Sequence, residues 1–150
     1  IIDVMIDSGI IFHPMEGTKY EDWGTYEEWL NYTRSKSTYF FDIDGVIYDN
    51  GSNYWEPKWG TNKIFVDAKK KINELYDSGN YIVLTTTRPE SFRKITAKQL
   101  KNDGLKYHQL IMDLFHGTRI LINDYSNTNP YPSAKAINTK RNSLDFLEKI

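Results

Sequence analysis

Two aspartates separated by one residue, Asp42 and Asp44, are the side chains of this sequence best suited to chemistry. They end the β-prone run at 38–42, and Gly45 follows, where the backbone can bend. Since side chains of a strand alternate between its faces, Asp42 and Asp44 should project to the same side. Crowded carboxylates repel each other unless a cation or proton lies between them. The pair therefore predicts a metal or acid–base site, and the alternative is a strand cap followed by a turn.

Polar residues also end two further runs that we expect to be strands. Residues 81–84 form an apolar run, which the polar sequence Thr-Thr-Thr-Arg follows at 85–88. Residues 118–122 form a second β-prone run, which ends at Asn123 and Asp124. In open α/β sheets, functional residues gather at the carboxyl ends of the strands. The three clusters therefore predict one shared site.

Helical and strand patterns alternate along most of the chain. Amphipathic helices are expected from about residue 62 to 78 and from about 91 to 103, with a closing helix from 142 or 143. The expected strands cover residues 38–42, 81–84, 108–112, 118–122 and 134–138. This order predicts an α/β fold with a parallel sheet of about five strands flanked by helices.

The residues before the first strand predict a separate segment. Thr25 and Glu28 have the spacing of a capping box, which indicates a short helix after Thr25 that buries Trp29. We therefore expect an N-terminal extension over residues 1–37 and one domain over residues 38–150.

Composition limits the classes of function. With 150 residues, 39% of them hydrophobic, the chain can bury one sizeable core. Its net charge of −1 gives no overall basic field, so nucleic acid is not an expected partner. The absence of Cys excludes a thiol nucleophile and fits a cytoplasmic protein. No apolar run approaches the roughly 20 residues that cross a bilayer. The chain begins at Ile1 rather than Met, which suggests a fragment or a processed chain.

The sequence Phe41-Asp42-Ile43-Asp44-Gly45-Val46 resembles the first signature of the haloacid dehalogenase (HAD) superfamily of phosphohydrolases. The resemblance implies a Rossmann-like fold in which Asp42 attacks phosphorus and forms an aspartyl-phosphate. It implies that Asp44 protonates the leaving oxygen and later activates water. The spacing of the signatures leaves no room for a separate cap domain, and capless relatives often take bulky substrates or borrow cover from a neighbouring subunit.

Two further segments match later signatures of that superfamily. Leu84-Thr-Thr-Thr-Arg-Pro is similar to a second signature that holds phosphoryl oxygens, which points to Thr86, with Thr85 as the alternative. Ile120-Leu-Ile-Asn-Asp124 is similar to the fourth signature. The resemblance thus implies Mg²⁺ bound by the carboxylates of Asp42 and Asp124 and by the carbonyl of Asp44.

The third signature departs from the pattern. Relatives commonly carry a lysine where this sequence has Leu114. Arg119 is the candidate substitute, because its charge would offset that of the aspartates and the phosphate. The alternative is an ordinary surface arginine at the start of a strand.

Residues 21–29 also resemble the closing segment of sugar-phosphate nucleotidyltransferases. The resemblance implies that residues 1–37 are the tail of an upstream domain of that kind, and that the protein acts in sugar-phosphate or capsular polysaccharide biosynthesis. The alternative is an ordinary capped helix.

These observations predict a Mg²⁺-dependent phosphomonoester hydrolase that acts on a phosphorylated small molecule or a larger phosphoester, as a homo-oligomer or in a chain fused to an upstream domain. One alternative is a nucleic-acid end phosphatase, because polynucleotide kinase-phosphatases share Asp-x-Asp-Gly and a similar threonine turn. Another is a catalytically degenerate binding module of the same fold, which Leu114 favours. The retention of Asp42, Asp44 and Asp124 opposes the binding module, since crowded carboxylates without a metal cost stability.

Overall fold

The computed structural model describes residues 7–9, 11, 13, 17, 22–51, 53, 55–126 and 133–150. The chain divides into two compact units, Ile1–Ser35 and Lys36–Ile150. Glu21, the first residue of the transferase-like segment, lies outside the described residues. Within the described part, no helix has the length and apolar character needed to cross a membrane.

The first unit contains helix α2, Tyr26–Arg34, which begins with the expected capping box. The backbone N–H of Thr25 donates to Glu28 Oε2 at 2.9 Å, and the backbone N–H of Glu28 donates to Thr25 Oγ1 at 3.2 Å. The prediction that this helix buries Trp29 is wrong. None of its residues is buried, and the Trp29 ring packs against Tyr26 on the helix's own surface instead.

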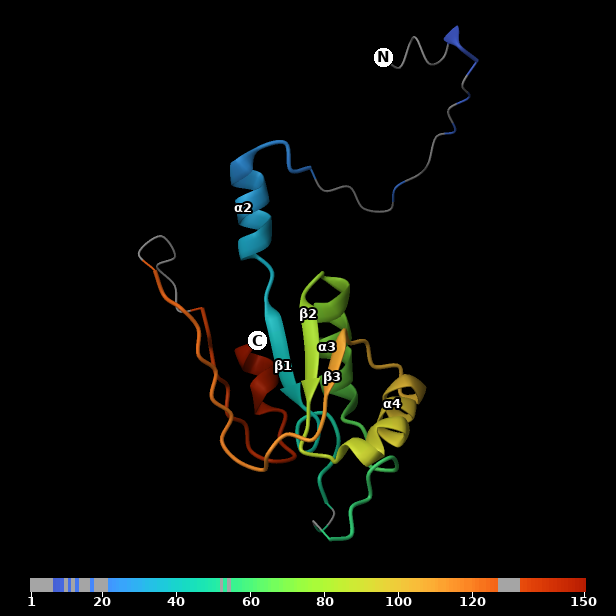
Figure 1. Cartoon of the computed structure of the whole chain (residues 1–150), viewed down its shortest axis with the longest axis vertical. Helices are drawn as coiled ribbons and strands as arrows, with labels where there is room; N and C mark the ends of the chain where they lie inside the picture. Colours follow the sequence, from blue (N-terminus) through green and yellow to red (C-terminus); the bar gives the residue numbers. More distant parts are fainter. Residues whose placement is uncertain are drawn as a thin grey trace. The chain divides into compact units, whose positions relative to one another are not determined.

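The second unit is built on a parallel sheet of three strands in the order β1-β2-β3 (Figure 1). The strands are β1, Thr38–Asp42, β2, Tyr81–Thr85, and β3, Gln109–Ile111. Asp42 pairs with Thr85, and Thr85 pairs with Ile111. The carboxyl ends of all three strands therefore meet at one edge of the sheet, and the expected α/β class is confirmed.

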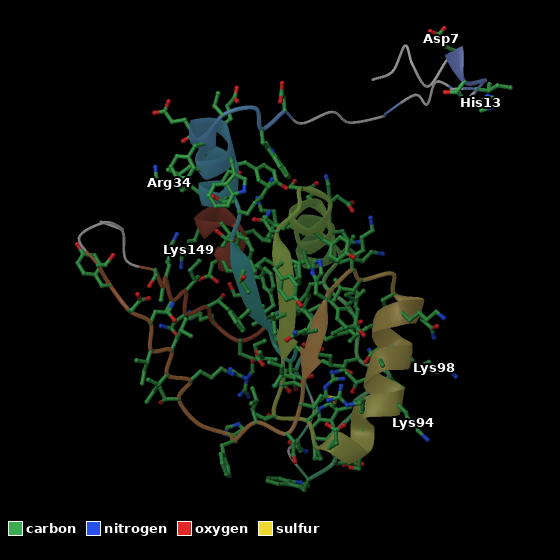
Figure 2. All side chains as sticks on the ribbon, turned by 45° about the horizontal axis from the view of Figure 1, so that its top comes forward. Asp7, His13, Arg34, Lys94, Lys98 and Lys149 are labelled. Atoms are coloured by element: carbon green, nitrogen blue, oxygen red, sulfur yellow. The ribbon has the colours of Figure 1, made fainter. Side chains whose placement is uncertain are left out.

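Helices connect these strands. Helix α3, Val66–Asp77, lies against β2, and α4, Arg93–Asn102, follows a 3₁₀ turn at Glu90–Phe92 (Figure 1). Lys94 and Lys98 of α4 point away from the sheet (Figure 2). The expected closing helix is a 3₁₀ helix, Asp145–Lys149.

The main hydrophobic core lies on one face of the sheet, and Val83 of β2, 2% exposed, is buried on the other face. Its buried hydrophobic residues are Phe41, Ile43, Ile47, Tyr48, Ala68, Ile72, Ile82, Leu84, Leu100, Leu105 and Phe146. The alternation along β1 is visible in its neighbours, because Phe41 is 6% exposed whereas Phe40 is 55% exposed on the opposite face. The helices therefore cover the Phe41 face of the sheet.

Two of the expected strands do not form. Residues 118–122 and 134–138 are irregular chain, so the described part holds three strands rather than about five. Ile120 is 81% exposed and Ile122 is 88% exposed. A β-prone run becomes a strand only where another strand supplies its hydrogen bonds, and β1 leaves its outer edge unpaired in the described sheet.

Candidate functional site

Asp42 and Asp44 line a cavity of about 480 Å³ at the carboxyl end of the sheet. The other residues of its wall are Asn50, Thr87, residues 116–119 and Arg141. The two aspartates reach the same cavity because β1 ends at Asp42 and the chain turns at Gly45, whose φ is +87°. The expected placement of the pair on one side of the chain agrees with this geometry.

The Asp44 carboxylate is bound by four side-chain donors. Arg88 donates from Nε to Oδ2 at 2.8 Å and from Nη2 to Oδ1 at 2.7 Å. Longer contacts of 3.4 Å come from the Thr86 hydroxyl and from Nδ2 of Asn62. A carboxylate has about four acceptor positions, so these donors fix the orientation of Asp44. The helix that was expected from about residue 62 begins at Val66, so Asn62 lies before it.

Arg88 is the buried cation behind Asp44. Its side chain is 0% exposed, and its Nη1 donates to the Thr96 hydroxyl at 3.1 Å. The guanidinium carbon lies 5.9 Å from the Tyr48 ring centre and 6.0 Å from that of Trp59. Burial and the hydrogen bond to Asp103 raise the pKa of the Tyr48 hydroxyl, which therefore stays neutral. Arg88 thus joins the turn after β2 to the loop after β1 and to helix α4.

Asp42 faces the cavity more openly. Its side chain is 35% exposed, and Arg119 Nη2 donates to Asp42 Oδ1 at 3.0 Å. Burial raises the pKa of Asp42; Arg119 opposes that shift, and the charge of Asp44 adds to it. Arg119 therefore lies where a cation was expected, next to the first aspartate.

The three threonines at 85–87 differ in their hydrogen bonds and in their position relative to the cavity. The Thr85 hydroxyl donates to the Phe41 carbonyl at 3.2 Å, and the Thr86 hydroxyl accepts from the Arg88 backbone N–H at 3.1 Å. Both are buried, and Thr87 is the member of the run that lines the cavity. The predicted phosphate-binding role of Thr85 and Thr86 stays a prediction, and Thr87 is a further candidate within the same run.

A short segment far along the chain completes the cavity. The backbone N–H of Asn142 donates to the Gly45 carbonyl at 2.8 Å, and Oδ1 of Asn142 accepts from the Asn50 N–H at 2.8 Å. A Cβ added at Gly45 would lie only 2.9 Å from Cγ of Arg141, so the Arg141 stem packs directly on this glycine. We call these contacts between Gly45, Asn50, Arg141 and Asn142 the latch.

Sequence reasoning did not single out Asn50, Thr87, His116, Thr118 or Arg141, all of which line the cavity. They lie in turns and loops without periodicity. Arg141 was the hardest of these residues to predict. The hydrogen bond that holds its segment at the cavity joins residues 92 positions apart, Asn50 and Asn142. Thr87 had a visible signal, since it belongs to the polar run that ends β2.

Asp124 does not join the other two acidic residues. It follows the exposed 118–122 segment and does not line the cavity, and its carbonyl accepts a hydrogen bond from the Ser133 hydroxyl at 2.8 Å. No group of three His, Asp or Glu side chains that could hold a metal ion occurs among the described residues. Asp42 and Asp44 line the cavity and Asp124 does not, and the expected Mg²⁺ site of the three residues stays a prediction.

Comparison with known proteins leaves the family open. No protein-family model matches the sequence, and no curated protein matches it. A crystal structure of a structural-genomics target from Vibrio cholerae is similar, with 14% sequence identity and a TM-score of 0.44 over 59% of this chain and 79% of that chain. A similarity at this level carries no information on function.

Proposed function

We propose that the protein is a phosphomonoester hydrolase that uses Asp42 as its nucleophile. The observation that carries the proposal is the Asp42 carboxylate at the cavity wall, with Asp44 beside it and Arg119 in contact. A nucleophilic carboxylate must approach a phosphate that is itself negative, so nearby cations are needed to offset the repulsion.

The charges around the cavity support this proposal. Arg88 compensates Asp44 from the buried side, and Arg119 compensates Asp42 at the wall. Arg141 adds a further positive charge to the same wall. With both aspartates compensated, a phosphate group entering the cavity meets a positive rather than a negative surface.

The proposed reaction has two steps. An Asp42 oxygen forms a bond to phosphorus while the bond from phosphorus to the leaving alcohol oxygen breaks. That oxygen takes the proton of the Asp44 carboxyl, which has to be protonated from solvent before this step. Water then attacks the aspartyl-phosphate and gives its proton to Asp44, which releases phosphate and restores the Asp42 carboxylate. Arg119 stabilises the charge on the transferred group in both steps.

Hydrolysis of an aryl phosphate tests the proposal. We expect Asp42→Asn to lower kcat by at least about a hundredfold, because the amide cannot attack phosphorus. Asp67→Asn is the matched control, since Asp67 is exposed on the first turn of α3, away from the cavity. Equal activity of wild type and Asp42→Asn would exclude the covalent mechanism.

The same assay with Mg²⁺ and with a chelator tests the metal requirement that the sequence resemblance implies. Loss of activity with the chelator would support a metal site that substrate oxygens and water complete, as is common for Mg²⁺. Retained activity would show that the arginines suffice. Sugar phosphates belong among the substrates tried, because of the resemblance at residues 21–29.

A phosphate-binding module without hydrolysis is the second candidate. The four donors on Asp44 favour it, because they occupy the oxygens that would exchange protons. Inorganic phosphate would then raise the melting temperature without any turnover of phosphate esters. Turnover that depends on Asp42 would exclude this candidate.

A further inference from the structure

Arg141 is a positively charged residue of the cavity wall that takes no part in the steps of the proposed reaction. We infer that Arg141 recognises a second anionic group of the substrate, so that the substrate class is a small phosphomonoester carrying an additional phosphate or carboxylate. The inference deepens the proposed function and rests on it for the identity of the first phosphate.

The first support is the distribution of charge. Each aspartate of the cavity wall already has an arginine partner, Arg88 for Asp44 and Arg119 for Asp42. Across the described residues, the Arg141 guanidinium has neither a hydrogen bond nor an ion pair, although it lines the same cavity. An arginine presents five N–H donors in a planar fork that matches a carboxylate or phosphate.

The second support is the latch, which holds Arg141 in place. Asn142 adopts φ +60°, uncommon for a residue other than Gly, and binds the Gly45 carbonyl and the Asn50 N–H through its backbone and side chain. The Arg141 stem rests on Gly45, where no Cβ fits. The position of the stem is therefore set before a ligand arrives, which lowers the entropic cost of binding.

The third support is the size and polarity of the cavity. Its volume of about 480 Å³ falls in the range of small-molecule sites, so the cavity accommodates a leaving group together with the phosphate. Asn50, Thr87 and Thr118 make the remaining wall polar. This environment suits a polar, charged leaving group rather than an apolar one.

Binding of two probes of similar size tests the inference without requiring turnover. Glycerol 3-phosphate carries one anionic group, and 3-phosphoglycerate carries a carboxylate in addition. We expect the wild-type chain to bind 3-phosphoglycerate about tenfold more tightly in calorimetry at low salt, as a charge-assisted pair allows. Arg141→Gln should bring the ratio of the two dissociation constants close to one, and Arg141→Lys should restore part of it.

Lys140→Gln is the matched control, because Lys140 is an exposed neighbour of the same charge that does not line the cavity. It should retain the wild-type ratio, and unchanged melting temperatures would confirm that each variant is folded. Equal affinities for both probes in the wild type, an unchanged ratio in Arg141→Gln, or no binding of either probe would overturn the inference. A ratio that depends on Arg141 in a protein without phosphatase activity would uphold the inference and reject only the hydrolysis.

Discussion

The position of Asp42 in the fold makes its negative charge destabilising for the folded state. Burial, the main cause, raises its pKa, so the folded chain binds a proton there more readily than the unfolded chain does. The stability cost is therefore present above the raised pKa and disappears as the pH falls below the ordinary carboxyl pKa. Such a cost is expected of a carboxylate that is kept for a reaction rather than for the fold.

We predict that Asp42→Asn raises the melting temperature at pH 7, since the amide removes a partly buried charge. The gain should shrink as the pH falls through the raised pKa, because the wild-type carboxyl then becomes neutral too. Thermal unfolding of both chains across acidic to neutral pH measures this. A lower melting temperature of Asp42→Asn at pH 7 would show that the ion pair with Arg119 outweighs the cost of burial.

Unlike Asp42, Arg88 carries a charge that stabilises the fold, because its buried guanidinium pairs with Asp44. Arg88→Gln would leave Asp44, 14% exposed, without its main partner, so we predict a loss of about 3 kcal/mol in the free energy of unfolding. Lys106→Gln is the comparison, because the exposed pair of Lys106 and Asp77 should contribute less than about 1 kcal/mol. Denaturant titration measures both, and equal losses would mean that the Arg88 pair is effectively solvated.

At the scale of elements, the latch depends on one backbone conformation. Gly45→Ala would place a Cβ at φ +87° and within 2.9 Å of Arg141 Cγ. We predict a loss of about 1–2 kcal/mol from the backbone conformation alone, with further loss if Arg141 has to move. Gly117→Ala is the control, since a Cβ there meets nothing within 4 Å. Equal unfolding free energies for the two variants would show that the loop after β1 adapts freely.

The apolar segment 118–122 makes a second prediction at this scale. Ile122→Lys should change the free energy of unfolding by less than about 0.5 kcal/mol, because Ile122 is 88% exposed. Ile82→Ala, at a fully buried position of β2, should cost about 2–5 kcal/mol. A large loss with Ile122→Lys would instead indicate that the segment is covered, as a strand paired with the free edge of β1 would be.

The elements could be predicted where local pattern was sufficient. α3 and α4 follow the amphipathic period of a helix, and β1, β2 and β3 coincide with the runs at 38–42, 81–84 and 108–112 that were expected as strands. Residues 118–122 have the same β-prone composition but no partner strand, and a partner is not a local property. Strand formation there could not be decided from composition alone.

The site shows the same division. The spacing of Asp42 and Asp44 predicted that both side chains lie on the same side of the chain. Arg119 was expected near them because the negative charge of the aspartates and a phosphate calls for a nearby cation. The bidentate pair of Arg88 and Asp44 was not foreseen, although Arg88 closes the polar run after β2. Arg141 could not be predicted, because no local pattern indicates that its loop returns to Gly45.

At the scale of the second unit, the cavity collects residues from four separate stretches of chain. The loop after β1, Thr87, residues 116–119 and Arg141 each supply part of its wall. A ligand that contacts all four stretches binds only the folded state of the unit and not the unfolded chain. Its binding free energy therefore adds to the stability of the whole unit.

The latch also orders events during synthesis. A growing chain that has reached Ile111 already contains the three strands, yet neither Arg119 nor Arg141 has been added. The long loop to Asn142 must close before the cavity wall exists, and closing a loop of this length is entropically costly. A ribosome-bound chain would therefore contain all three strand segments before the residues that complete the cavity wall have been added.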